Sequence, residues 1–278
     1  DVLHFSSKAR LADVMAWIKR VSGAQVVSSV GLPGDASARA YRRVFLDGQP
    51  CILMQVPTAS MSVDPFVSMA RFLFDSGITV PSVYHVDRAS GWVLISDFGD
   101  QLLLSVTHPF DVSRYYKQAI DALLDMQKIN VRNCALLEPY CAEKLHSELA
   151  LFIDWYCEAY RKQGMDDTQR KRLARFFDQL VSEILAQPQV FVHRDYHARN
   201  IMVLDEGDVG IIDFQDAVIG PVTYDLLSLL RDCYRDFSDD FVRNCIDYYR
   251  INAESAGLMP KVDRQTFMAW FDAVSVQR

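Results

Sequence analysis

Three side chains in a fixed order constrain this chain more than any other feature of its sequence. Asp195 and Asn200 lie five residues apart in the stretch 193–200 (HRDYHARN), which follows an apolar run, and Asp213 comes thirteen residues after Asn200. The intervening residues 201–212 favour two short strands joined by a polar turn. The order therefore predicts a loop and then a strand hairpin, whose end directs the second carboxylate into a cleft.

The same order has a chemical meaning. The pattern H-R-D-x-x-x-x-N, followed by an aspartate after a strand, is typical of kinase active sites. Phosphoryl transfer needs a carboxylate that orients and deprotonates the acceptor hydroxyl, and we predict that Asp195 is this base. It also needs oxygen ligands that hold Mg²⁺ on the phosphates of ATP, a role that we predict for Asn200 and Asp213. Each residue alone could be a turn or cap residue, but the combined spacing is specific for kinases.

The composition is that of a globular protein with small-molecule partners. Of the 278 residues, 50% are hydrophobic and 23% are charged, which suits one large domain or two lobes. A formal net charge of -7 and the lack of Lys/Arg clusters argue against nucleic acid as a partner. No apolar run is long enough for a membrane span, no leader precedes the fold, and the six cysteines lack C-x-x-C spacing. We therefore expect a cytoplasmic protein, and we favour a monomer.

The two ends of the chain differ in their apolar periodicity. Up to residue 96, β-favouring runs alternate with turn signals such as Asp47-Gly48, whereas helical periodicity dominates after Gly99. The elements expected in the first part are helices at 11–21 and 66–74 and strands at 40–46, 51–56, 80–86 and 92–96. Those expected in the second part, besides the two short strands, are helices at 112–129, 142–160 and 168–185, helices that begin at Tyr224 and Phe241, and a last helix at 267–278.

This division predicts an α+β protein with two lobes. We expect an N-terminal nucleotide-binding lobe over residues 1–96, with a small antiparallel sheet and a leading helix. Residues 97–101 form the connector, and a mainly helical catalytic and substrate-binding lobe spans residues 102–278. Because the sequence ends within a helical pattern, we expect that its C-terminal part is incomplete.

The loop before the first hairpin is the expected place for the phosphates of the nucleotide. Gly34 and Ser37 are small enough for close backbone approach, and Arg39 supplies a cation. Such a stretch is also compatible with an ordinary turn. Kinases commonly carry a lysine on the next strand, but this chain has Met54 there, so Arg39, Arg42 or the neighbouring Arg43 must supply the charge. Strand alternation sends the last two to opposite faces, so at most one of them serves from the strand.

The tripeptide Asp97-Phe98-Gly99 copies the D-F-G motif of kinases but cannot have its role. It lies upstream of the loop that carries Asp195, whereas the metal-binding aspartate of kinases lies downstream. Its position assigns it to the connector. We count Ser96 and Asp97 among the expected nucleotide-binding residues, with a turn as the alternative for Asp97.

Three further side chains flank the expected base. His197 could donate a hydrogen bond to the γ-phosphate or could be packed within the loop. Arg194 and Arg199 could bind phosphate or an anionic substrate, or could brace the loop.

The chain resembles the aminoglycoside phosphotransferase and choline kinase superfamily. Only ten residues separate Asp213 from Tyr224, which is too few for the activation segment of protein kinases. Within the superfamily the chain is similar to the anomeric kinases of N-acetylmuramate and N-acetylglucosamine. The residues that carry this similarity are 34–37, Arg39, 41–42, Met54, 64–67, 192–197, 199–200, 213–217, 220–221 and 224–226.

The resemblance implies a protein-kinase-like fold and an ATP- and Mg²⁺-dependent transfer of phosphate to the C1 hydroxyl of an amino sugar, in cell-wall recycling. It implies that methionine in place of the lysine, as at Met54, is a feature of this subgroup and does not mark an inactive enzyme. Asp225 would be structural, holding the catalytic loop from a helix N-terminus, and Asp216 would face the substrate.

Two alternatives remain. The first is a kinase for an aminoglycoside, choline or another alcohol, for which cationic substrates would require an acidic groove. The carboxylate of N-acetylmuramate would instead require an arginine such as Arg194, Arg199 or Arg231. The second alternative is a pseudokinase that binds a nucleotide without catalysis, suggested by the missing lysine. The intact Asp195, Asn200 and Asp213 argue against it.

Overall fold

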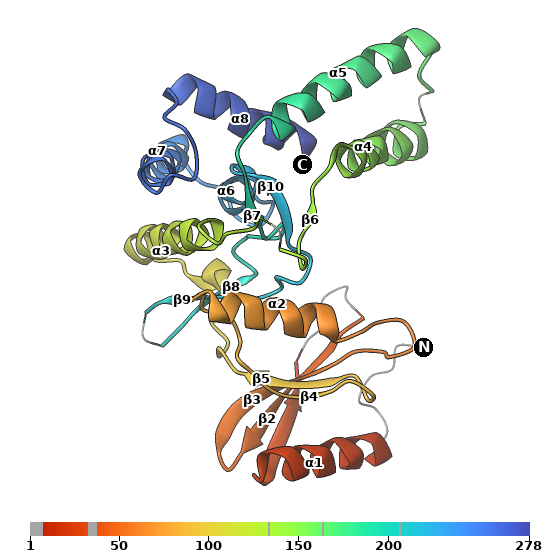
Figure 1. The fold of residues 1–278 in the computed structure, drawn as a ribbon, viewed down its shortest axis with the longest axis vertical. Coiled ribbons are helices and arrows are strands. Elements are labelled where there is room, and N and C mark those ends of the chain that lie inside the picture. Colours follow the sequence, from red (N-terminus) through yellow and green to blue (C-terminus); the bar gives the residue numbers. More distant parts are fainter. Residues whose placement is uncertain (1–7, 33–37, 133, 163, 206) are drawn as a thin grey trace. The chain divides into compact units, whose positions relative to one another are not determined.

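The computed structural model describes residues 8–32, 38–132, 134–162, 164–205 and 207–278, and the chain forms two compact units (Figure 1). The first unit contains Asp1–Gln101 and Met202–Gln215, and the second contains Leu102–Ile201 and Asp216–Arg278. The first unit includes the expected connector, residues 97–101. It also includes Met202–Gln215, which the sequence analysis assigned to the second lobe.

This difference has a physical cause in backbone pairing. The hairpin of β8 (Ile201–Val203) and β9 (Val209–Ile211) bonds to the N-terminal part of the chain. The amide of Val203 donates to the carbonyl of Gln101 at 2.7 Å, and the amide of Ile211 donates to that of Thr79 at 2.9 Å. Such long-range pairing leaves no trace in local periodicity.

The first unit is built on one antiparallel sheet of five strands in the order β1-β2-β3-β5-β4. The strands are β1 (Val26–Gly31), β2 (Ala40–Leu46), β3 (Gln49–Gln55), β4 (Val83–Asp87) and β5 (Trp92–Ser96). The expected hairpin is confirmed: Asp47 and Gly48 have φ values of 48° and 87°, as a tight turn between twisted strands requires. The sequence did not predict β1, and β4 begins three residues later than expected.

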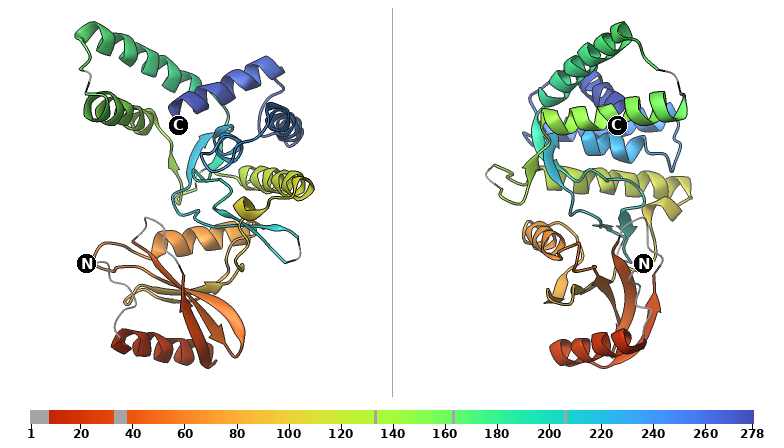
Figure 2. Two further views of the ribbon diagram at one scale, coloured as in Figure 1. Left: turned by 180° about the vertical axis from the view of Figure 1, so that it is seen from behind. Right: turned by 90° about the vertical axis from the view of Figure 1, so that its right-hand side faces the viewer.

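Two helices flank this sheet on opposite faces (Figure 2). The helix α1 (Lys8–Ser22) packs Val14, Trp17 and Ile18 onto one face, in a core that includes Leu53. The helix α2 (Asp64–Asp75) presents a buried stripe to the other side and ends before Gly77, whose φ is 83°. Both helices match the sequence prediction.

The second unit is mainly helical. It contains a short 3₁₀ segment, η1 (Leu103–Ser105), and the helices α3 (Pro109–Gln127), α4 (Ala142–Leu151), α5 (Asp167–Leu185), α6 (Tyr224–Leu230), α7 (Asp239–Ser255) and α8 (Arg264–Gln277). The helix expected at 142–160 has the predicted extent, but its second half, η2 (Phe152–Tyr160), is a π-helix without buried residues. None of the described helices combines the length and the apolar character that a membrane crossing requires.

A small sheet leads into the loop 193–200, which carries the expected base. Its strands β6 (Glu138–Pro139), β10 (Val218–Pro221) and β7 (Gln189–Val192) lie in this order, with β7 and β10 antiparallel. Sequence patterns did not predict these strands because two to four residues are too few to show alternation. The side chains of Phe191 and Val192 are fully buried, so β7 fixes the place where the loop 193–200 begins.

Candidate active site

The loop 193–200 is anchored by a buried carboxylate. The backbone amides of His193 and Arg194 donate to Asp225 at 2.6 and 3.0 Å. Asp225 lies in the first turn of α6 and is fully buried, so its position confirms the structural role that the resemblance implied. Burial raises the pKa of Asp225 to about 7, while the two amide donors and Arg278 act in the opposite direction.

The residue before the expected base has a strained backbone. Arg194 has a φ of 77°, a region that costs a residue with a Cβ atom about 1–3 kcal/mol. Its amide bonds to Asp225, its carbonyl accepts from Arg278 at 2.9 Å, and its guanidinium donates to Glu148 at 3.0 Å. These contacts hold the turn that exposes Asp195, whose side chain is 51% accessible.

The same loop brings the expected base and an expected metal ligand together. The side-chain nitrogen of Asn200 donates to the carbonyl of Asp195 at 3.0 Å, and the amide of His197 donates to the same carbonyl at 3.0 Å. Asn200 is buried, and its own amide donates to the carbonyl of His197 at 2.9 Å. The Asn200 side chain is therefore oriented by the loop, and its Oδ1 atom is a hard oxygen ligand suited to Mg²⁺.

The third motif residue lies in the first unit, next to the expected phosphate-binding arginine. Asp213 follows β9 with a φ of 65°, and its carboxylate lies 3.7 Å from the guanidinium of Arg39. Arg39 also hydrogen-bonds the hydroxyl of Tyr41, whose pKa is raised by burial and by Asp213 and lowered by Arg39. The next residue, Phe214, is fully buried and stacks on Phe66 at 5.3 Å, which fixes the backbone that carries Asp213.

The D-F-G copy lies in the connector, as predicted, and its carboxylate is engaged there. Arg43 donates to both oxygens of Asp97, to Asp100 at 3.0 Å and to the carbonyl of Gly99 at 3.1 Å. The side chain of Asp97 is only 3% accessible and also accepts the amide of Gly99 at 2.8 Å. Arg43, one of three arginines considered for the phosphates, thus binds the connector.

Two residues that the sequence analysis linked to the nucleotide, Ser96 and Met54, lie in strands of the first sheet. The hydroxyl of Ser96 accepts the amide of Ser82 at 2.9 Å and so closes the end of β5. Met54 is fully buried and lies opposite Tyr41 in the β2–β3 pair, so an apolar side chain fills the place where a lysine was expected. A nucleotide contact by Ser96 or Asp97 stays a prediction.

The remaining residues of the expected phosphate loop are only partly described. Arg42 donates to the hydroxyl of Ser29 at 3.2 Å, so it and Arg43 have different partners, as strand alternation predicted. Gly34 and Ser37 lie outside the described residues.

The side chains that flank the base in the loop share an aromatic neighbour. The ring of Tyr234 lies 5.2 Å from that of His197 and 5.0 Å from the guanidinium carbon of Arg199. Burial lowers the pKa of His197, so the neutral imidazole dominates at neutral pH. Asp216 is exposed at the start of the chain segment that returns to the second unit.

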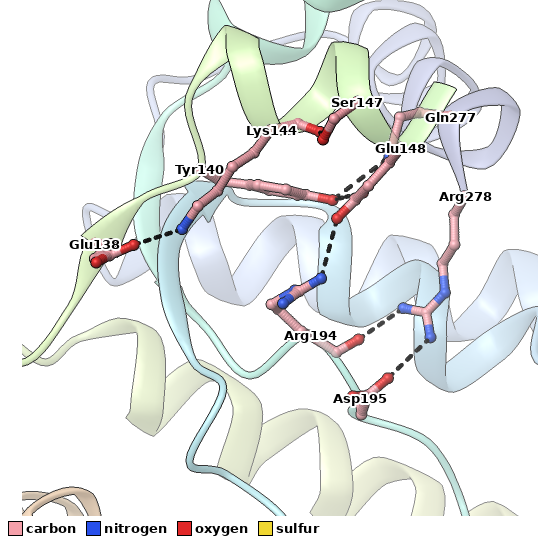
Figure 3. A network of polar contacts seen from close by, with 9 residues as sticks. All are labelled: Glu138, Tyr140, Lys144, Ser147, Glu148, Arg194, Asp195, Gln277 and Arg278. Atoms are coloured by element: carbon pink, nitrogen blue, oxygen red, sulfur yellow. Dashed lines mark hydrogen bonds and ion pairs between the residues drawn. The ribbon is translucent and has the colours of Figure 1, made fainter. Parts of the chain in front are cut away.

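A polar network that sequence reasoning missed surrounds the base (Figure 3). Gln277 donates to Glu148 at 2.8 Å, and Glu148 also accepts from the hydroxyl of Tyr140. Arg278 donates to the carbonyl of Arg194 and to the hydroxyl of Ser228, and lies 3.9 Å from the carboxylate of Asp195. No local pattern marks these residues, because the network joins positions far apart in the sequence.

The oxygen chemistry of the motif suits a magnesium ion held mainly by nucleotide phosphates. Asn200 and Asp213 each supply oxygen and no soft donor, which is the ligand type that Mg²⁺ prefers. Within the described part of the chain, no group of three or more His, Cys, Asp or Glu side chains could hold a metal ion. Two protein ligands that complete a phosphate-bound ion would not form such a group.

Comparison with known proteins places the chain among phosphotransferases. The model of the phosphotransferase enzyme family matches residues 29–260. An N-acetylmuramate/N-acetylglucosamine kinase from Pseudomonas aeruginosa is 36% identical over 244 residues, covering 88% of this chain and 71% of the relative. A protein of the same name from Neisseria meningitidis is 33% identical over 267 residues, covering 94% and 78%.

Solved structures show the same fold. The ADP-bound aminoglycoside phosphotransferase APH(2'')-Ib matches with a TM-score of 0.66 and 16% identity, covering 98% of this chain and 97% of that one. A choline kinase from Streptococcus pneumoniae matches with a TM-score of 0.66 and 13% identity, covering 97% and 89%. The predicted two-lobed, protein-kinase-like α+β fold is confirmed.

Proposed function

We infer the function on the premise that the chain belongs to the phosphotransferase enzyme family. We propose that it transfers the γ-phosphate of ATP to the C1 hydroxyl of an amino sugar, N-acetylmuramate or N-acetylglucosamine, in cell-wall recycling. The observation that carries this proposal is the anchored loop: Asp225 holds the backbone directly before the exposed Asp195, and Asn200 donates to the Asp195 carbonyl. The names of the relatives at 36% and 33% identity support the substrate.

In the proposed reaction, Asp195 accepts a hydrogen bond from the C1 hydroxyl and aims its oxygen at the γ-phosphorus. The new O–P bond forms as the bond to the bridging oxygen of ADP breaks, and the hydroxyl proton passes to the carboxylate of Asp195. A carboxylate suffices because a loose transition state releases this proton late.

We propose that a magnesium ion and Arg39 together neutralise the negative charge of the phosphates. Asn200 and Asp213 would hold Mg²⁺ through their oxygens, and the ion supplies charge neutralisation on the β- and γ-phosphates when bound. Arg39 supplies the positive charge of the missing lysine. Its guanidinium lies 3.7 Å from the carboxylate of Asp213, which supports this role. Met54 contributes packing only, since its side chain is fully buried.

The acidic group of N-acetylmuramate would need a cation near the sugar. Of the three arginines considered, Arg194 pairs with Glu148 at 3.0 Å and Arg231 pairs with Asp239 at 3.3 Å. Arg199 stacks on Tyr234. Because Arg199 lies between Asp195 and Asn200 in the loop, we propose it as the first of the three to test for discrimination between the two sugars.

The test is ADP release with Mg-ATP and a panel of amino sugars, aminoglycosides and choline, with ³¹P NMR to identify an anomeric phosphate. We expect release with the two amino sugars, and Asp195→Asn should lower kcat by at least about 100-fold. Asp240→Asn, which alters an exposed carboxylate paired with Arg243, is the matched control and should not change kcat. Absence of sugar-dependent ADP release, or an Asp195→Asn variant equal to wild type, would contradict the proposal. ADP release with only choline or only an aminoglycoside would identify that compound, and not an amino sugar, as the substrate.

We further propose that the protein is a cytoplasmic monomer, as expected from its composition. Size-exclusion chromatography with light scattering should give a mass near 31.7 kDa for this chain, and a dimer mass would contradict the proposal.

A further inference from the structure

Two side chains at the end of α8 connect it to the catalytic loop, Gln277 through Glu148 and the following residue, Arg278, directly. Gln277 reaches Glu148 on α4, and Glu148 in turn holds the guanidinium of Arg194. Arg278 reaches the carbonyl of Arg194 and, with the same nitrogen, the hydroxyl of Ser228 on α6. Arg194 is therefore held by its side chain and its carbonyl (Figure 3), and its amide donates to Asp225.

The guanidinium of Arg278 is well placed to orient the base. The group is planar and rigid. The two acceptors bound by one terminal nitrogen therefore also fix the position of the other terminal nitrogen. That second nitrogen lies 3.9 Å from the carboxylate of Asp195, and the guanidinium carbon lies 5.3 Å from the ring centre of Tyr224. The side chain of Arg278 is only 29% accessible, so its guanidinium is in contact with protein on several sides.

The distance to Asp195 matters for catalysis. At 3.9 Å the contact is electrostatic and longer than a hydrogen bond, so the acceptor positions of the carboxylate are not capped by Arg278. A base must keep such a position for the hydroxyl that it deprotonates. Arg278 can therefore aim the carboxylate without blocking it.

We propose that Arg278 is a positioning residue for phosphoryl transfer, which fixes the strained Arg194 backbone and directs the carboxylate of Asp195 toward the acceptor hydroxyl. The proposal rests on the proposed function, and it adds to the catalytic loop a residue that lies 84 positions from Arg194 in the sequence. It explains how a non-glycine residue keeps a φ of 77° directly before the base: the carbonyl of this residue is bound by Arg278.

The test is the kinetics of Arg278→Gln with Mg-ATP and the preferred sugar. We expect kcat to fall about 10- to 100-fold, because a displaced base loses its near-attack geometry, with both KM values within about twofold of wild type. Arg264→Gln is the matched control: it removes an arginine from the same helix, where it pairs with Asp247 at 3.0 Å, and should leave kcat unchanged. A kcat equal to wild type, or a raised KM with unchanged kcat, would overturn the proposal. If Arg278→Gln does not fold, Arg278→Lys keeps the charge but not the fork, and a kcat equal to wild type in that variant would also overturn it.

A second readout separates this proposal from the proposed function. Hydrogen exchange of the peptide that contains the His193 and Arg194 amides needs no substrate. We expect these amides to lose protection in Arg278→Gln and to keep it in Arg264→Gln. Lost protection in a protein without sugar-dependent activity would support positioning and reject the proposed function. Unchanged protection and unchanged kcat in an active enzyme would reject positioning alone.

Discussion

The proposed catalytic loop and the proposed phosphate-binding region around Asp213 are held in place by different kinds of contact. In the loop 193–200, backbone amides bond to the buried carboxylate of Asp225, and main-chain contacts set the position of Asp195. Around Asp213, order comes from side chains: Arg39 lies at 3.7 Å in a pair whose carboxylate is 45% accessible. The loop therefore depends on a few buried atoms, whereas the phosphate region depends on a more accessible pair of charged side chains.

This contrast explains why the chain departs from the kinase pattern in one region only. The loop 193–200 keeps both residues of the kinase pattern that supply oxygen, Asp195 and Asn200. A change in the backbone hydrogen bonds that hold this loop would displace the proposed base. The lysine position is filled by Met54, and a nearby arginine can replace a point charge with little change of backbone.

Loss of the loop anchor should have the largest effect. Asp225→Ala leaves the amides of His193 and Arg194 without their acceptor inside the protein, which should cost about 3 kcal/mol of unfolding free energy. Activity should fall at least about 100-fold, since the base loses its place. Urea unfolding and kcat measure the two effects. Asp239→Ala is the matched control, an exposed aspartate in the first turn of α7, and should change neither. If both variants behaved alike, the buried anchor would not differ from a surface cap.

Loss of the phosphate-side cation should have a moderate effect confined to ATP. Arg39→Ala should lower kcat/KM for ATP about tenfold, the value of one charge-assisted contact, and leave the KM of the sugar unchanged. Arg88→Ala removes an exposed arginine of the same unit, paired with Asp64, and should have no effect. Unchanged KM and kcat for ATP in Arg39→Ala would show that another cation replaces the lysine.

The anchor should also be visible in the pH dependence of stability. The pKa of Asp225 is raised from 3.8 to about 7 in the folded protein. Its contribution to stability is therefore fully present below pH 4 and is lost as the pH rises to about 7, because the folded state holds the proton more tightly in that window. The stability of wild type relative to Asp225→Asn should thus fall between pH 4 and pH 7, measured by urea unfolding at several pH values. A constant difference would contradict the raised pKa.

The sequence predicted most elements of the fold that have a local signal. Apolar stripes located α1 and α2, and the Asp47-Gly48 turn located the β2–β3 hairpin, because helical periodicity and turn chemistry depend on near neighbours. The short strands β7 and β10 and the grouping of β8–β9 with the first unit were not predictable, because they depend on pairing between distant segments.

The site divides in the same way. The spacing of Asp195, Asn200 and Asp213 marks three residues whose chemistry is carried by one continuous stretch. Arg278 has no such signal, since it lies 84 residues from Arg194, whose carbonyl it contacts. The same holds for the Arg43–Asp97 pair, which joins β2 to the connector across more than fifty residues. Motifs reveal what a site does, whereas the side chains that position it become visible only in the folded chain.

The smallest effect is expected at His197, which lies in the loop without anchoring it. Burial lowers its pKa, so the side chain is neutral near pH 7 and does not add a positive charge at the γ-phosphate. His197→Gln, which keeps a hydrogen-bond donor, should change kcat less than about threefold between pH 7 and 8. His108→Gln, at an exposed histidine near Asp111, is the control. Because the folded state resists protonation of His197, wild type should lose stability relative to His197→Gln as the pH falls below 6.5. A kcat loss as large as that of Asp225→Ala would show that the loop depends on a side chain as much as on its buried anchor, and the contrast between the two regions would no longer hold.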